Sequence, residues 1–161
     1  MSKTVSFTGH RAAAYDFSST KAYEMRNRLS DAIRKAVLQG FDVFCTGMAQ
    51  GFDMIAAEAV LHERDNLSPH IRLTCIIPHK GQEHKWERPL RLKYELITSL
   101  ADEVLCLNDS YISGCFHERN RQLVKRADRL ICLYSGKAGG TRHTVQLAEE
   151  KGIEIVNIWE E

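Results

Sequence analysis

The spacing of apolar residues along the chain alternates between a period of about two residues and a period of about 3.6 residues. The shorter period is typical of strands, and the longer one of helices that bury one face. Strands are predicted over residues 4–8, 42–46, 71–78, 103–108, 129–134 and 154–158. Most of these segments are apolar at nearly every position, as expected for strands of a parallel sheet that is covered on both faces.

Five apolar stripes with helical spacing lie between these strands. They comprise Met25, Leu29, Ala32, Ile33, Ala36 and Val37; Ile55, Ala56, Ala59 and Val60; Leu90, Tyr94, Ile97 and Ala101; Leu123, Val124 and Ala127; and Val145, Leu147 and Ala148. Gly40 and Gly152 follow the first and last stripes, where left-handed residues end helices. The alternation predicts one α/β domain over residues 1–161, a Rossmann-like, doubly wound, mainly parallel sheet with helices on both faces.

The composition narrows the class of protein. The 161 residues include 43% hydrophobic and 27% charged residues, ordinary values for a globular domain. Lys and Arg number 22 against 21 Asp and Glu, a net charge of +1, which does not favour wrapping around nucleic acid or lying on an anionic membrane. No apolar run reaches the roughly 20 residues that span a bilayer, and no signal peptide is recognisable. We expect a cytoplasmic protein without membrane contact.

The five cysteines do not suggest a disulfide framework or a metal site. Cys45, Cys75, Cys106 and Cys132 lie inside apolar strand segments and are predicted to be core residues. Cys115 follows Gly114 at a predicted helix start, where it is either a thiolate favoured by the helix dipole or a spectator thiol. No CxxC pair occurs and the histidines lack a zinc-ligand spacing, so the sequence predicts no metal site.

Glycine-rich turns follow three of the predicted strands. In doubly wound sheets, ligands bind beyond the carboxyl ends of the strands. Two of these turns lead into helices, whose first N–H groups suit a phosphate, and glycine lets the backbone approach it. Neither a P-loop nor a GxGxxG fingerprint is present, which disfavours a standard kinase or dehydrogenase. The turns supply the ligand-binding candidates Gly9, His10, Arg11, Gly47, Met48, Ala49, Gly51, Gly139, Gly140 and Thr141.

Further polar side chains lie near the same strand ends. Arg11 and His10 are expected to neutralise a phosphate, with Arg11 offering a bidentate fork. Tyr111 is placed to stack on a base, and Thr144 offers a hydroxyl near the last glycine-rich turn. These further ligand-binding candidates are Asn108, Tyr111, Arg119, Asn120 and Thr144.

Two carboxylates and one tryptophan carry alternative interpretations. Asp53, in the first turn of the second helix, is either favoured there by the helix dipole or binds a ribose. Glu58 either hydrogen-bonds sugar hydroxyls or forms a surface ion pair. Trp86, in a polar loop after the third strand, is either a lid over a bound base or packs its loop onto the body of the domain.

The ordered set of motifs resembles the YpsA-like branch of the SLOG superfamily. The motifs are Phe7-Thr8-Gly9-His10-Arg11, then residues 46–53 with Ala56-Ala57-Glu58, Arg119-Asn120, Ala127-Asp128, Tyr134-Ser135-Gly136, and Gly139-Gly140-Thr141 with Thr144. The superfamily includes the Lonely Guy phosphoribohydrolases and the Rossmann-like domain of DNA-processing protein A. The resemblance implies a Rossmann-like sheet whose strand ends bind a nucleotide or a ligand derived from one, such as ADP-ribose or an NAD-related molecule.

The resemblance also implies how the strand ends meet. With the order 3-2-1-4-5 of related folds, the ends of the first, second, fourth and fifth strands would be neighbours. Residues 9–11, 47–51, 108–114 and 139–141 would then surround one cleft. The family resemblance is also compatible with a homodimer.

The chain departs from the Lonely Guy pattern at its last glycine-rich turn. Lonely Guy enzymes carry Gly-Gly-x-Gly-Thr-x-x-Glu, whereas residues 137–144 read Lys-Ala-Gly-Gly-Thr-Arg-His-Thr. Aligned on Gly140-Thr141, Thr144 occupies the position of the glutamate that helps to cleave the N-glycosidic bond; aligned on Gly139-Gly140, Gln146 does. Neither Thr nor Gln can take that role. Glu58 or Asp53 would have to act in its place.

Three functions remain, in order of preference. The first is a binding module that captures a nucleotide and signals to a protein partner as a sensor or regulator. The second is an enzyme, an N-glycosidic hydrolase of nucleoside monophosphates or NAD-like nucleotides with Asp53 or Glu58 as catalytic groups. Binding of single-stranded DNA ranks third, because Arg119, Arg121, Lys125, Arg126 and Arg129 cluster around one helix but stacking aromatics are few.

Overall fold

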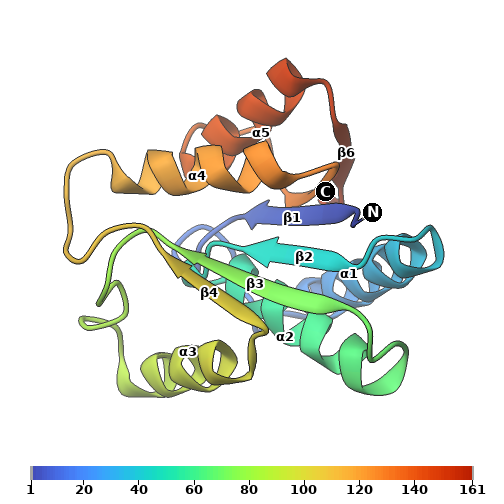
Figure 1. The fold of residues 1–161 in the computed structure, drawn as a ribbon, viewed down its shortest axis with the longest axis horizontal. Coiled ribbons are helices and arrows are strands. Elements are labelled where there is room, and N and C mark those ends of the chain that lie inside the picture. The colour runs from blue at the N-terminus through green and yellow to red at the C-terminus, as the bar shows by residue number, and fades with distance from the viewer. Residues whose placement is uncertain (1, 161) are drawn as a thin grey trace.

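Strands and helices alternate strictly along the chain in a computed structural model that describes residues 2–160 (Figure 1). In chain order the elements are β1 (Thr4–Gly9), α1 (Thr20–Leu38), β2 (Val43–Thr46), α2 (Phe52–Asn66), β3 (Arg72–Ile77), α3 (Arg88–Leu100), β4 (Glu103–Cys106), α4 (Cys115–Arg126), β5 (Arg129–Leu133), α5 (Gly140–Lys151) and β6 (Glu154–Asn157). Every predicted strand is present, most of them shortened at one or both ends. The predicted Rossmann-like α/β class is confirmed.

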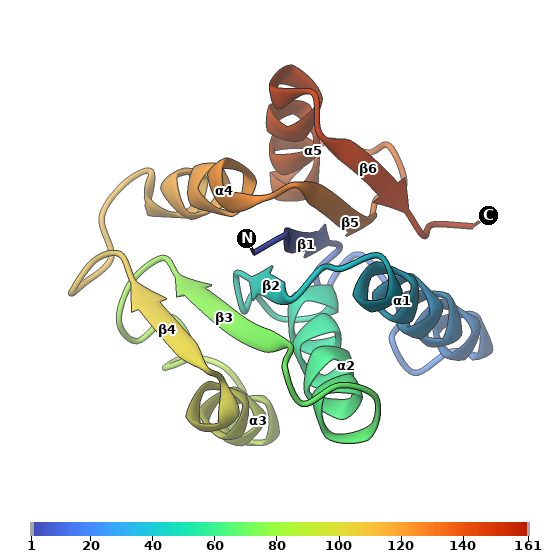
Figure 2. The same cartoon turned by 45° about the vertical axis from the view of Figure 1, so that its right-hand side comes forward.

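The six strands form one parallel sheet in the order β4-β3-β2-β1-β5-β6. In chain order, the strands are added from β1 outward to β4 at one edge of the sheet. The next two strands, β5 and β6, are added on the other side of β1. Because right-handed crossovers put helices on opposite faces when the direction of succession reverses, α1, α2 and α3 lie on one face and α4 and α5 on the other (Figure 2). The topological switch point lies between β1 and β5.

The predicted strand order 3-2-1-4-5 is wrong. β4 pairs with β3 at the edge of the sheet, with Cys75 opposite Val104, and it is β5 that lies beside β1. The segment after β4 must therefore return across the sheet before α4 begins. The carboxyl end of β4 is not a neighbour of the end of β1.

The helices begin and end at residues with a local reason to do so. The Ser19 side chain accepts a hydrogen bond from the Ala22 N–H at 3.1 Å and caps α1. Pro89 lies in the first turn of α3, where a missing N–H costs nothing. Gly40 and Gly152 have φ values of +92° and +78°, as predicted for the residues that end α1 and α5.

The larger core lies between the sheet and α1, α2 and α3. Phe7, Phe44 and Phe52 are fully buried in it, with Phe7 stacked on Phe44 at 6.1 Å between ring centroids. A smaller core under α4 and α5 is built around Leu130 and Val145. The sheet is thus covered on both faces, which fixes the ends of its central strands.

One of the cysteine predictions is wrong: Cys106 is exposed, because β4 is an edge strand. Cys115, the first residue of α4, is buried. Cys45, Cys75 and Cys132 are buried core residues, as predicted. Within residues 2–160, no helix combines the length and apolar character needed to cross a membrane.

Candidate functional site

A cavity of about 390 Å³ opens at the carboxyl ends of β1 and β5, at the topological switch point. Its walls come from the segment after β1, the turn before α2, the first turns of α4, and the turn that leads into α5. The lining residues are Thr8, Gly9, His10, Arg11, Ala13, Ala14, Ala49, Asp53, Phe116, His117, Arg119, Asn120, Leu123, Lys137, Ala138, Gly139, Gly140 and Thr141. Ten of them, from Gly9 to Thr141, are binding or catalytic candidates named from the sequence.

Packing requires the glycine that ends β1 and the glycine that precedes α2. A Cβ on Gly9 would lie 2.4 Å from the Phe52 ring, and a Cβ on Gly51 would lie 2.8 Å from both the Ala12 nitrogen and the His10 oxygen. Gly51 also has a φ of +99°, a region that favours glycine. The Phe52 N–H donates to the His10 carbonyl at 3.1 Å, which joins the start of α2 to the end of β1. Gly51 itself does not line the cavity.

The turn between β2 and α2 is held by its own polar groups. The Thr46 hydroxyl donates to the Asp53 carbonyl at 3.0 Å, and the Ala49 N–H donates to the Asp53 carboxylate at 3.2 Å. Met48 adopts a φ of +57°, rare for a residue with a side chain, and that side chain is fully buried. Ala49 and Asp53 face the cavity, whereas Met48 does not line it.

Asp53 is a carboxylate enclosed by protein at the floor of the cavity. Its burial raises its pKa, against the opposing effects of the Arg119 charge and the Ala49 N–H. The Asp53 and Arg119 side chains form no direct ion pair within 4.0 Å. Their attraction therefore does not fully offset the free energy that each charge loses when it leaves water. Burial therefore favours the neutral form of Asp53 over the carboxylate.

Arg119 reaches the same floor from α4. It is 4% exposed, donates to the Gly47 carbonyl at 2.9 Å, and donates to the Asn120 side chain at 3.1 Å. Burial lowers its pKa, although the Asp53 charge opposes that effect. A Cβ on Gly47 would lie 2.6 Å from the Arg119 side chain. The glycine at position 47 therefore makes room for Arg119 rather than for a ligand.

The raised pKa of Asp53 makes stability depend on pH. The folded protein binds the Asp53 proton more tightly than the unfolded chain, so the free energy of unfolding falls as pH rises above the unfolded pKa of 3.8. We expect Asp53→Asn to gain stability relative to wild type as the pH rises above about 4, by about 1.4 kcal/mol for each pH unit that separates the two pKa values. Urea denaturation across this range measures the difference.

The matched control is Asp65→Asn, which neutralises an exposed carboxylate on the same helix. Its stability relative to wild type should change little over the same range. If the free energies of unfolding of Asp53→Asn and wild type changed in parallel with pH, burial would not destabilise the ionised carboxylate of Asp53.

His10 does not supply the positive charge expected of it. Its Nε2 accepts a hydrogen bond from the Ser135 N–H at 2.9 Å, so this nitrogen carries no proton and the ring is neutral. Burial, followed by the charge of Lys137, also lowers the pKa of His10. The prediction that His10 neutralises a phosphate is therefore corrected. The ring instead ties the end of β1 to the segment after β5.

The first turn of α5 is the open side of the cavity. A Cβ on Gly139 or Gly140 would have no neighbour within 4 Å, and Gly139 has a φ of +147°. No side chain caps the N-terminus of α5, so its first N–H groups have no side-chain partner there, and the residues of this turn line the cavity. Thr141 lines the cavity, but Thr144 is fully buried and donates to the Gly140 carbonyl at 3.2 Å.

Cations and one aromatic ring complete the walls. Arg11 is exposed and lies over the Phe116 ring with its guanidinium carbon 5.6 Å from the centroid, and Arg119 lies 5.7 Å from the same centroid. Lys137 projects from the turn after β5. Sequence reasoning did not select Phe116, His117, Lys137 and Ala138, although the last two lie inside the glycine-rich segment that it had identified.

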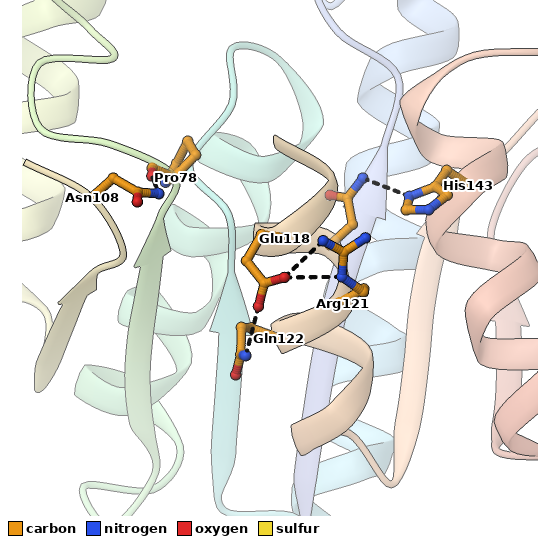
Figure 3. A network of polar contacts seen from close by, with 7 residues as sticks. Pro78, Asn108, Glu118, Arg121, Gln122 and His143 are labelled. Atoms are coloured by element: carbon orange, nitrogen blue, oxygen red, sulfur yellow. Dashed lines mark hydrogen bonds and ion pairs between the residues drawn. The ribbon is translucent and has the colours of Figure 1, made fainter. Parts of the chain in front are cut away.

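Asn108 and Tyr111 do not line this cavity, which corrects their predicted role. Asn108 donates to the Pro78 carbonyl at 2.9 Å, and Figure 3 shows this pair beyond β3, far from His143 on α5. Tyr111 is 62% exposed and packs edge-on against His79. Both residues lie away from the cavity because β4, which they follow, is at the edge of the sheet. Asn120, in contrast, lines the cavity and has its side-chain nitrogen 3.3 Å from His143.

Glu58 also lies outside the cavity. It is on the exposed side of α2, 3.6 Å from Lys93 of α3, in a separate groove between these helices. The surface ion pair, rather than contact with a sugar, is what the structure shows. Trp86 lines a second cavity next to the first and packs edge-on against Tyr94 at 5.3 Å.

The basic residues around α4 are largely occupied. Arg121 is paired with Glu118 at 2.7 Å, with Gln122 bonded to the same carboxylate (Figure 3). Arg129 is 7% exposed and paired with Glu154 at 2.8 Å, while Arg119 is buried. Across residues 2–160, no group of three or more His, Cys, Asp or Glu side chains is placed to hold a metal ion.

A parallel sheet with a glycine-walled cavity at its switch point defines a Rossmann-like α/β protein. The sequence model named YpsA, described as the YspA SLOG family, matches residues 5–155. The chain belongs to this family.

Relatives with similar sequences come from bacilli. The chain is 25% identical to UPF0398 protein ABC2016 of Shouchella clausii (strain KSM-K16) over 137 residues, which cover 84% of this chain and 73% of that protein. It is 27% identical to the SPbeta prophage-derived protein YoqJ of Bacillus subtilis (strain 168) over 119 residues, covering 66% and 69%.

Solved structures share the fold at low sequence identity. DNA processing protein A (DprA) from Streptococcus pneumoniae aligns with a TM-score of 0.64 and 17% identity, covering 96% of this chain and 49% of that one. The protein of that name from Helicobacter pylori, solved for its single-stranded DNA binding mode, aligns with a TM-score of 0.64 and 20% identity, covering 95% of this chain and 63% of that one. The TM1055 structure aligns with a TM-score of 0.59 and 15% identity, covering 95% of this chain and 72% of that one.

Proposed function

We propose that the chain binds the phosphate of a nucleotide, or of a ligand derived from one, in the cavity between β1 and β5. The observation that carries this proposal is the uncapped first turn of α5. Its Gly139 and Gly140 are open to the cavity, and Arg11 and Lys137 line the same space. Unpaired N–H groups at a helix N-terminus and nearby cations are the groups that bind phosphate in proteins.

The charges around the cavity favour an anion over a cation. Arg11, Lys137 and Arg119 line it, and Asp53 is the one carboxylate among its lining residues. Burial raises the pKa of Asp53, which favours its protonated form, and that form has no negative charge to repel a phosphate. Family membership and the likeness to DprA support a role related to nucleotides or nucleic acids.

A binding module is the function that the lining residues support best. Thr144, at the position of the Lonely Guy glutamate, is buried with its hydroxyl bonded to the backbone, and Glu58 is outside the cavity. The ligand-bound protein would then signal to a protein partner. One observation favours the hydrolase as a second candidate: Asp53 lines the cavity, and its raised pKa suits a proton donor to a leaving base.

A panel of nucleotides separates these functions. Purified protein is incubated with AMP, CMP, ADP-ribose, NAD and a single-stranded oligonucleotide, with thermal stability and free base measured in parallel. We expect a mononucleotide or ADP-ribose to raise the melting temperature without release of base. Multiple-turnover release that Asp53→Asn abolishes would establish the hydrolase instead. Stabilisation by the oligonucleotide alone would contradict the mononucleotide site.

A further inference from the structure

We propose that the cavity beside Trp86 is the base subsite of the same ligand, and that it selects a base carrying an exocyclic amino group. This inference rests on the proposed phosphate site and adds the class of base. The second cavity, of about 210 Å³, is lined by Arg11, Ala12, Ala13, Ala49, Gln50, Gln82, Trp86 and Phe116.

The two cavities adjoin. Arg11, Ala13, Ala49 and Phe116 line both of them, so one ligand can occupy both at once. Charge differs between the two sides of this shared wall. The first cavity has Lys137, Arg119 and the α5 N-terminus, whereas the second has amide and aromatic side chains, with Arg11 as the one charged residue among those that line it. The first therefore suits the phosphate and the second an uncharged aromatic ring.

Two aromatic side chains give the second cavity surfaces for stacking. Trp86 is held edge-on by Tyr94, with ring centroids 5.3 Å apart. Phe116 packs against Tyr111, with ring centroids 6.1 Å apart, and the guanidinium carbons of Arg11 and Arg119 lie 5.6 Å and 5.7 Å from its centroid. Both rings are partly exposed, so each retains surface for a ligand. Stacking on aromatic rings is the usual way in which proteins hold an unpaired base.

The side-chain amide of Gln82 has a fixed orientation. Its Nε2 lies 3.4 Å from the Gly47 carbonyl, 3.3 Å from the Met48 carbonyl and 3.5 Å from the Tyr94 hydroxyl. Two carbonyl oxygens can only face a donor, so the nitrogen must point toward them and Oε1 away from them. Among residues 2–160, Oε1 has no hydrogen-bond partner, and it is not enclosed.

The free group that Gln82 brings to the cavity is therefore an acceptor. An amino group, such as that of adenine or cytosine, can donate to it. A keto oxygen at the same position, as in hypoxanthine or uracil, would place two acceptors against each other and leave both unpaired. This asymmetry predicts that amino bases bind more tightly than their keto counterparts.

Three probes separate the subsites: ribose 5-phosphate, AMP and inosine monophosphate, with affinities measured by calorimetry. We expect AMP to bind about 10-fold or more tightly than ribose 5-phosphate, because of stacking. We expect it to bind about 10-fold more tightly than inosine monophosphate, because of the amino group. In Trp159→Phe protein, where Trp86 is the remaining tryptophan, AMP but not ribose 5-phosphate should quench the fluorescence.

Variants of the subsite supply the controls. Trp86→Ala should lower AMP affinity toward that of ribose 5-phosphate, because Phe116 and Gln82 alone then contact the base. The affinity for ribose 5-phosphate should be unchanged. Gln82→Ala should remove the preference for AMP over inosine monophosphate. Gln82 also holds the turn at residues 47–48. The affinity of the Gln82→Ala protein for ribose 5-phosphate and its melting temperature therefore report whether the phosphate site is intact.

The failures are distinguishable. Equal affinity for AMP and ribose 5-phosphate, or an AMP affinity that Trp86→Ala leaves unchanged, would overturn the base subsite and leave the phosphate site standing. Equal affinity for AMP and inosine monophosphate would overturn the selection of amino bases. If none of the three probes bound, the proposed function itself would fall, and the base subsite with it.

Discussion

Gly51→Ala is expected to lower the free energy of unfolding by about 4 kcal/mol, a large part of the stability of a domain of this size. Two effects combine. The φ of +99° strains any residue with a side chain, and the new Cβ would lie 2.8 Å from the His10 oxygen and the Ala12 nitrogen. Both contacts are with backbone, which cannot move aside as a flexible side chain can. Urea denaturation followed by circular dichroism measures the loss.

Gly114→Ala is the matched control. Gly114 has a φ of +85° before α4, but a Cβ there would have no neighbour within 4 Å. Its substitution should therefore cost only the conformational preference, about 1 kcal/mol. Equal losses at positions 51 and 114 would mean that the close approach of α2 to the segment after β1 contributes nothing.

Arg11→Ala is expected to weaken nucleotide binding by about 10-fold to 100-fold, the effect of losing a charge-assisted hydrogen bond to phosphate. The melting temperature of the free protein should change little, because Arg11 is exposed and its described contact is with the Phe116 ring. Calorimetric titration with AMP measures the affinity. Arg11→Lys should restore part of it, since lysine keeps the charge but not the bidentate fork.

Arg88→Ala provides the corresponding surface control. Arg88 is exposed at the start of α3, outside both cavities, and its removal alters the net charge by the same amount. Affinity for AMP should be unchanged. If Arg11→Ala bound AMP as tightly as wild type does, Arg11 would have no part in holding the phosphate.

The sequence was sufficient for the fold class and the positions of the elements, because both follow from local apolar periodicity. The strand order was not predictable in the same way. A right-handed crossover can place β4 beside β3 or beside β1, and nothing within residues 103–106 distinguishes these neighbours. The exposed Val104 and Cys106 mark the edge only once the sheet is known. The misplacement of Asn108 and Tyr111 followed from this one error.

The candidate site was predicted in outline because strand ends in such sheets are marked by glycine. Glycine serves two needs that look alike in a sequence. At Gly9, Gly47 and Gly51 it admits neighbouring protein atoms, whereas at Gly139 and Gly140 it leaves open space. Phe116, in contrast, is indistinguishable in the sequence from a core residue. Only the return of α4 from the sheet edge brings it to the cavity.

The position of β1 in the sheet has a consequence for the kinetics of folding. β1 pairs Thr4 with Val43 of β2, but it pairs Val5 with Arg129 of β5, much later in the chain. The entropy of loop closure makes the second pairing the slower to form. The cavity between β1 and β5 exists only after it has formed. A ligand that touches both walls should therefore act mainly on the unfolding rate, holding the two parts of the chain together after they have met.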